Sequence, residues 1–221
     1  MFLANAYADH KGDPNAIPAI ARRFCASSFK AAQSPAGLDH TRIAPVVKDK
    51  ARLKDFKRAQ RNAGGKPTPA LSEELNNELV IVCAEDTPTR TRYLGADELA
   101  AIGVKRQELR AFAIKNLESG LPKINLISGA PAQSLTADGD YDANLPLFGH
   151  IWSSGQIKVR SDIVVALPAR DMLLMTGSRD QEGMAGLRVM AAKYGKERPH
   201  RPTDKLFLHR QGRFYPLPAA P

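Results

Sequence analysis

Residues 162–192, DIVVALPARDMLLMTGSRDQEGMAGLRVMAA, decide the fold of this chain. Two apolar runs, Ile163–Leu167 and Met172–Thr176, flank the turn-forming segment Pro168–Asp171. Short apolar runs joined by a tight turn predict an antiparallel hairpin. A helix is predicted from about Asp180, because acidic residues in a first turn suit the helix dipole. We expect the hairpin to be central in its sheet, with only its tip displayed as a functional surface.

The rest of the chain repeats this rhythm of strand pairs separated by helices. Further strand pairs are predicted within 79–94, 123–137 and 205–215. Helices are predicted at 15–33, 96–101 and 105–117, with a short one after residue 142. Short loops within each pair imply antiparallel strands. The sequence therefore predicts an α+β fold: a mostly antiparallel sheet built from hairpins, with the helices between the strand pairs packing on it.

Breaks in the pattern suggest how the chain is organised. Pro45 limits the short strand Ile43–Val47 to an edge or an end of a sheet. Glycine and proline at 64–67 mark a break after the basic segment that follows this strand. We therefore expect four parts. They are an N-terminal helix, short strand and basic segment (1–62), a linker (63–78), the main hairpin-helix domain (79–215) and a loose tail (216–221).

Charge is distributed unevenly along the chain. The formal net charge is +9 overall, but +8 in residues 1–70, −4 in 71–192 and +5 in 193–221. A uniform nucleic-acid-binding domain is not expected to look like this. No apolar run approaches the roughly 20 residues that span a bilayer, so we expect no membrane partner. Two cysteines without a CxxC motif indicate a reducing, cytoplasmic setting.

The most basic window of the chain is residues 48–66. A solvated helix followed by a linker is the simpler interpretation, and a segment that contacts a polyanion is the alternative. The window lacks the interleaved aromatic residues that favour binding of single-stranded nucleic acid. Its candidate patch consists of Lys48, Lys50, Lys54, Lys57, Arg58 and Arg61.

Three aspartates alternate in the turn before residue 143. Asp138, Asp140 and Asp142 have the spacing that begins a calcium loop, but Ala143 and Gly149 stand where such a loop needs Gly and Glu. The simpler interpretation is a turn in which Asp140 or Asp142 caps a helix. The alternative is a magnesium or catalytic carboxylate role. We assign no metal site.

Three further charged residues are candidates for ligand or surface contacts. Arg170 and Asp171 lie at the tip of the hairpin, where a charged pair is usually exposed, and Asp86 follows a strongly apolar strand. Whether Asp86, Asp140 and Arg170 border one cleft is the decisive structural question. The chain has no HExxH, GxSxG or GxGxxG motif, so we expect no zinc and no other cofactor.

Several segments together resemble a known bacterial family. They are LVIVCAEDTPTRTRYL at 79–94, AIKNL at 113–117, LTADGDYDANL at 135–145 and DIVVALPARDMLLMTGS at 162–178, with weaker matches at 1–7 and 43–47. With these segments the chain resembles the YtpQ-like family, a bacterial domain of unknown function. The resemblance implies a cytoplasmic α+β protein and no catalytic residues. It also implies further chain before the segment FLANAY, so we expect a missing first strand and an edge that is open or paired with a partner.

The sequence leaves three hypotheses for function. The first is a non-enzymatic binding or scaffold domain whose basic ends recruit an acidic protein or a nucleic acid. The second is a hydrolase or phosphate-handling enzyme that uses Asp138, Asp140, Asp142 and Arg170. The third is nucleic-acid binding through residues 48–66.

Overall fold

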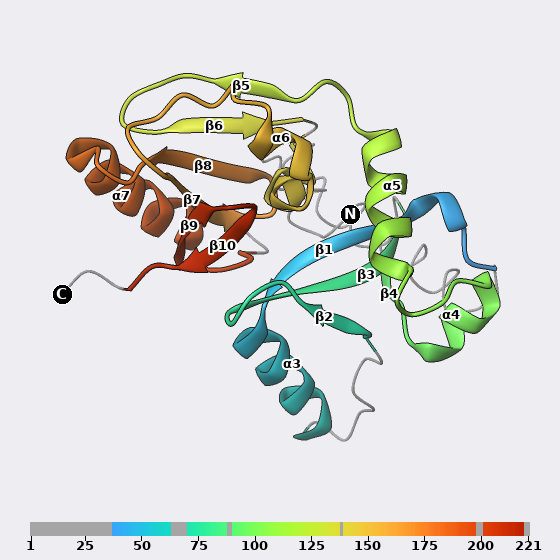
Figure 1. The fold of residues 1–221 in the computed structure, drawn as a ribbon. Helices are drawn as coiled ribbons and strands as arrows, with labels where there is room; N and C mark the ends of the chain where they lie inside the picture. Colours follow the sequence, from blue (N-terminus) through green and yellow to red (C-terminus); the bar gives the residue numbers. More distant parts are fainter. Residues whose placement is uncertain (1–36, 63–69, 88–89, 138, 198–200, 219–221) are drawn as a thin grey trace, which may run out of the picture.

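The structure is a computed structural model that describes residues 37–62, 70–87, 90–137, 139–197 and 201–218. The helix predicted at 15–33 and the start of the chain lie outside these residues. Within the described part, two antiparallel sheets carry helices on their faces (Figure 1). The fold is α+β with antiparallel sheets, as the sequence predicts. The division into two sheets is not part of that prediction.

The smaller sheet is built around one long central strand. β3 (Leu79–Thr87) pairs with β1 (Ile43–Asp49) on one side and with β2 (Ser72–Glu74) and β4 (Arg90–Tyr93) on the other. The edge position that Pro45 predicts for the first strand is confirmed. β2 lies inside the stretch 63–78 that the sequence suggests as a linker.

The larger sheet has the strand order β10-β9-β7-β8-β6-β5. Its inner hairpin pairs β7 with β8, and β9 pairs with the other side of β7. The prediction that the decisive hairpin is central is therefore confirmed. The bounds of its strands are β5 Asn125–Ile127, β6 Gln133–Thr136, β7 Ile163–Ala169, β8 Met172–Gly177, β9 Leu206–Arg210 and β10 Arg213–Pro216.

The tip of the central hairpin is less exposed than the sequence predicts. Ala169 is fully buried and Arg170 is half-buried. The backbone N–H of Ala143 donates to the carbonyl of Arg170 at 3.0 Å, so the chain after the aspartate-rich turn packs directly against this tip. The residues of a turn predict an exposed turn. The segment that buries this one lies far away in the sequence, so no local pattern indicates it.

The central strands of the larger sheet carry apolar side chains on both faces of the sheet, and a helix covers one of these faces. α7 (Gln181–Glu197) packs Leu187 and Ala191 on Val164 and Leu174 of the larger sheet. The other face of this sheet meets the main core, which explains why its central strands show no polar alternation. The remaining helices are η2 His40–Arg42, α3 Lys50–Asn62, α4 Ala96–Ile102, α5 Leu109–Gly120, η3 Asp142–Leu147 and α6 Gly149–Ser153.

One core joins the two sheets. Leu79 and Val47 of the smaller sheet belong to the same buried cluster as Val165, Leu173 and Phe207 of the larger sheet. β1 supplies a partner to β3 although the two strands fall on opposite sides of the expected linker. Among the described helices, none is both long enough and apolar enough to cross a bilayer.

Candidate functional site

The structure brings three of the predicted site residues together. Asp86, Asp140 and Arg170 all border one small cavity, and Lys48 of the predicted basic patch borders it too. Asp86 lies near the end of β3, Lys48 lies in β1, and Arg170 lies in the turn between β7 and β8. The cavity therefore forms where the smaller sheet meets the turn segments of the larger one.

Each carboxylate at this cavity is held by a specific partner. Thr91, opposite Asp86 in the β3–β4 pair, donates its hydroxyl to Asp86 Oδ1 at 2.8 Å. The Tyr141 hydroxyl donates to Asp86 Oδ2. Arg170 Nη2 donates to Asp140 Oδ1 at 2.6 Å. Arg170 and Asp140 form an ion pair. Lys48 and Asp86 also line the cavity, so its formal charges balance.

The surroundings keep Tyr141 and Arg170 protonated, as their contacts with the two carboxylates require. Burial raises the pKa of Tyr141 well above its usual value, and the hydrogen bond to Asp86 raises it further. The phenol therefore stays protonated and remains a donor. Burial lowers the pKa of Arg170, but the hydrogen bond to Asp140 and nearby negative charge outweigh this effect and raise it overall. The guanidinium stays charged.

The size of the cavity limits what it holds. Its volume is about 60 Å³, which is room for a few water molecules. Ligand pockets typically have about 300–1,000 Å³. Asp86, Asp140 and Arg170 thus form a polar junction between the two sheets rather than an opening for a substrate.

The other predicted acidic residues lie elsewhere. Asp142 is 2% exposed, and its Oδ1 accepts the backbone N–H of Ala137 at 2.9 Å. The capping prediction for Asp140 or Asp142 is wrong, because Tyr141 is the N-cap of η3 and no side-chain bond caps this helix. Asp138 lies outside the described residues, and Asp171 is half-buried in the hairpin turn. Within the part of the chain that the structure describes, no group of three acidic, histidine or cysteine side chains is arranged for a metal ion.

The predicted basic patch is split between two elements. α3 carries Lys50, Lys54, Lys57, Arg58 and Arg61, whereas Lys48 belongs to β1. Lys50 pairs with Glu74, and Arg58 Nη2 lies 2.8 Å from Asp55 Oδ1. Lys50 and Arg58, two of the six cations of this patch, are therefore paired with carboxylates.

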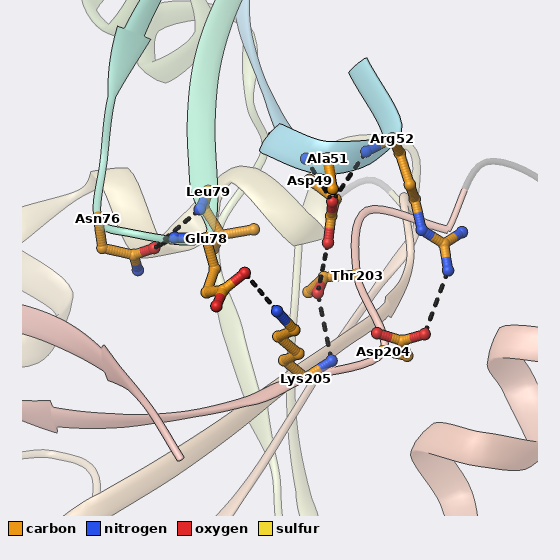
Figure 2. Close-up of polar contacts among 9 residues, drawn as sticks. All are labelled: Asp49, Ala51, Arg52, Asn76, Glu78, Leu79, Thr203, Asp204 and Lys205. Atoms are coloured by element: carbon orange, nitrogen blue, oxygen red, sulfur yellow. Dashed lines mark hydrogen bonds and ion pairs between the residues drawn. The ribbon is translucent and has the colours of Figure 1, made fainter. Parts of the chain in front are cut away.

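Polar contacts tie the start of α3 to the segment before β9, as Figure 2 shows. Asp49 is 6% exposed, and its Oδ1 accepts the N–H groups of Ala51 and Arg52 at 2.9 and 3.0 Å. The hydroxyl of the buried Thr203 donates to Asp49 Oδ2 at 3.4 Å. Nearby, Lys205 pairs with Glu78, which precedes β3 (Figure 2).

This junction brings the two basic ends of the sequence together. Asp204 Oδ2 lies 3.3 Å from Arg52 Nη2 of α3 and 3.6 Å from Arg201 Nη2. The side chain of Arg201 in turn lies against α7, because a β-carbon placed on Gly195 would be 2.7 Å from Arg201 Cδ. α3 is therefore connected to α7 through Asp204 and Arg201.

A groove of about 700 Å³ lies between α7 and the residues on either side of β9 and β10. Its cations are Arg188, Lys196, Arg201 and Lys205, and its acids are Glu78 and Asp204. Both acids are engaged by lysine or arginine. The side chains of Arg188 and Lys196 are exposed and make no ion pair or hydrogen bond with any residue that the structure describes.

These groove residues are not among the candidates that the sequence predicts. The excess of positive charge in residues 193–221 signals the region but not the surface. Arg188 and Lys196 are eight positions apart, so they lie on the same side of α7 and about 12 Å apart along its axis. This spacing, in a helix whose opposite face is apolar, is the signal that points to the groove.

Comparison with known proteins gives a family without an assigned activity. Over 152 residues the chain is 27% identical to a UPF0354 protein of Bacillus cytotoxicus, covering 67% of this chain and 56% of that protein. The chain is similar to the UPF0354 proteins. UPF0354 proteins of Bacillus thuringiensis and Bacillus cereus match over the same length at 27% and 26% identity.

The chain spans about half the length of the UPF0354 proteins it matches. No protein-family model matches the chain. No solved structure matches it either.

Proposed function

We propose that this chain is a non-enzymatic binding domain that holds an acidic protein segment in the groove along α7. The observation that carries the proposal is the pair Arg188 and Lys196, exposed on one face of the helix without partners among the described residues. Two cations about 12 Å apart match acidic side chains that recur along an extended segment. The other two cations of the groove, Arg201 and Lys205, are paired with Asp204 and Glu78, so its net positive charge comes from Arg188 and Lys196.

The lining of the groove favours a protein over a nucleic acid. Of the described residues that line it, half are apolar and none is aromatic: Ala191, Ala192, Leu206, Pro216, Leu217 and Pro218. Single-stranded nucleic acids gain much of their affinity by stacking on aromatic rings, which this groove does not offer. An acidic segment with some apolar side chains would use both the charge and the apolar floor.

The hydrolase hypothesis has less support from the geometry. It requires the acidic turn to present carboxylates to a substrate. Asp142 is buried against the backbone, Asp140 is paired with Arg170, and the cavity beside them has about 60 Å³. These contacts favour a structural role for the cluster, so we place the function of the chain on the groove.

We also propose a cytoplasmic location and a YtpQ-like identity within the wider family likeness. The location is supported by the two cysteines, of which Cys83 is a buried free thiol. The identity is supported by the segments at 79–94 and 162–178, which form the central strands of the two sheets. A nucleic-acid role for α3 stays a prediction.

The proposal is tested with a fluorescein-labelled peptide of repeating Glu-Glu-Leu units and the full chain. Fluorescence anisotropy measures binding to the wild type and to the double variant Arg188→Glu/Lys196→Glu. We expect the double variant to bind at least about tenfold more weakly, which corresponds to about 1.4 kcal/mol. Binding to the wild type should weaken as salt is added, because exposed charges are screened.

The matched control is Lys115→Glu/Lys123→Glu, which changes the net charge equally at exposed positions outside the groove. This control should retain most of the binding. Equal loss in both double variants would reveal attraction by net charge alone and contradict the proposal. Tighter binding of a fluorescein-labelled 12-nucleotide DNA strand, lost in the same groove variant, would favour the nucleic-acid alternative.

A further inference from the structure

Another opening lies between the two sheets, on the other side of Pro216 from the groove along α7 and much larger than the cavity at Asp86. It has a volume of about 550 Å³, within the range typical of small-molecule sites. The β2–β3 loop forms one wall through Leu75, Asn76 and Asn77, and the β9–β10 hairpin forms the opposite wall. Asn76 Nδ2 donates to the carbonyl of Phe214 at 3.0 Å and links the two walls.

Aromatic side chains gather at this pocket. Trp152, His209 and Phe214 line it and pack on one another, with ring centroids 4.9–5.2 Å apart. Tyr215 also lines it and is 45% exposed. Trp152 is held in place because its indole N–H donates to the carbonyl of Leu145 at 3.3 Å. The pocket thus offers ring surfaces in a fixed arrangement.

The charge of the pocket has one sign. Among the described residues that line it are Arg110 and Arg213 but no Asp or Glu. Arg110 Nη1 donates to Glu73 Oε1 at 2.8 Å, which orients its side chain. A guanidinium carries five N–H donors, so this bond leaves several donors on Arg110. The side chain of Arg213 is exposed and makes no hydrogen bond or ion pair with a described residue.

We propose that this pocket binds a small ligand made of a planar aromatic group and an attached carboxylate or phosphate. The rings of Trp152 and Tyr215 contact the aromatic group, and Arg110 and Arg213 bind the anion. A guanidinium group can bind either a carboxylate or a phosphate through paired N–H donors. The Asn77 amide adds hydrogen-bonding capacity at the rim, whereas the Asn76 amide is engaged by Phe214, Glu78 and Leu79. This site is independent of the proposed protein-binding groove.

The chain contains a single tryptophan, so its one indole N–H resonance reports directly on the pocket. The 15N-labelled full chain is titrated with phenylacetate, phenyl phosphate and the neutral phenylacetamide. We expect both anions, or one of them, to shift the Trp152 indole signal saturably at millimolar concentration, as fits ligands of this size. Phenylacetamide should bind at least about fivefold more weakly.

The variant Arg213→Gln should weaken binding of the anion about fivefold. The matched control Arg160→Gln, at an exposed arginine that does not line the pocket, should leave binding unchanged. Tighter binding of phenyl phosphate than of phenylacetate would assign a phosphate to the ligand, and the reverse order a carboxylate. Equal affinity for phenylacetamide, an unchanged Arg213→Gln variant, or no indole shift up to about 20 mM would each overturn the proposal.

Discussion

Val47 and Asn144 are joined by a buried hydrogen bond across 97 positions of the sequence. The backbone N–H of Val47 donates to Asn144 Oδ1 at 2.8 Å. β1 is an edge strand of the smaller sheet, and an edge strand leaves backbone donors without a strand partner. Asn144 of η3 satisfies one of these donors and attaches the smaller sheet to the turn segments of the larger one.

Asn144→Ala is expected to destabilise the protein through this bond. Asn144 is 4% exposed, so its loss leaves the Val47 N–H buried and unsatisfied. Such a group costs about 1–3 kcal/mol in the free energy of unfolding. Urea unfolding followed by circular dichroism measures the change. Asn125→Ala is the control, since the Asn125 amide bonds only locally, to the Lys123 carbonyl, at an exposed site. Equal stability of the two variants would contradict the role of Asn144.

Gly186→Ala tests the contact between α7 and the turn before β6. A β-carbon at Gly186 would lie 2.2 Å from side-chain carbons of Pro131, closer than real atoms approach. We expect a loss of about 1–3 kcal/mol, because the helix or the turn must shift. Gly120→Ala is the matched control in a helix, since a β-carbon there meets nothing within 4 Å. Thermal unfolding should show a lower Tm for Gly186→Ala alone.

Cys83 is expected to be an unreactive thiol in the folded protein. Burial raises its pKa to about 12, and the charge of Glu73 adds to this effect. At pH 8 only about one molecule in 10⁴ carries the thiolate, which is the reactive form. In a Cys25→Ser variant Cys83 is the sole thiol, so its reaction with 5,5′-dithiobis(2-nitrobenzoate) should be slow until urea is added. Fast reaction of the folded variant would refute this expectation.

His209 is expected to make the protein less stable in mild acid. Burial lowers the pKa of this imidazole below its usual value, and its Nε2 has no hydrogen-bond partner among the described residues. The unfolded chain then binds the proton first, so stability falls as the pH drops below about 6.5 towards the folded pKa. Urea unfolding of wild type and His209→Gln between pH 7.5 and 5 measures this contribution. As the pH falls, the wild type should lose stability relative to His209→Gln. A constant difference would contradict it.

The sequence predicts the central hairpin and the final helix well because their signals are local. Ile163–Leu167 and Met172–Thr176 are apolar runs with a turn between them, and the structure pairs them in this way. The helix predicted from about Asp180 begins at Gln181. Asp180 caps it, with Oδ1 accepting the Gly183 N–H at 3.0 Å.

The division into two sheets is not predictable from such signals. Nothing in the composition of β1 or β3 specifies that they pair with each other and not with the larger sheet. The pairing depends on the shared core, in which Val47 meets residues from much later in the chain.

The polar cluster is predicted in part. Asp86, Asp140 and Arg170 are identified as candidates and do border one cavity. Their partners are missed, because the Tyr141 hydroxyl reaches Asp86 across 55 positions. Asp142 reads as a surface residue in an acidic turn, but it is buried where it accepts the Ala137 N–H. Burial of a polar side chain depends on tertiary contacts that no local pattern contains.

The contact between Asp49 and Thr203 bears on how the chain folds as it is made. The two residues are 154 positions apart, and Thr203 directly precedes the strands that complete the larger sheet. During synthesis β1 emerges long before β9, so the core that the two sheets share stays incomplete until residues 203–214 leave the ribosome. Closing such a long loop late is slow and leaves apolar surface open meanwhile. The nascent chain therefore passes through a long stage in which protection from aggregation matters most.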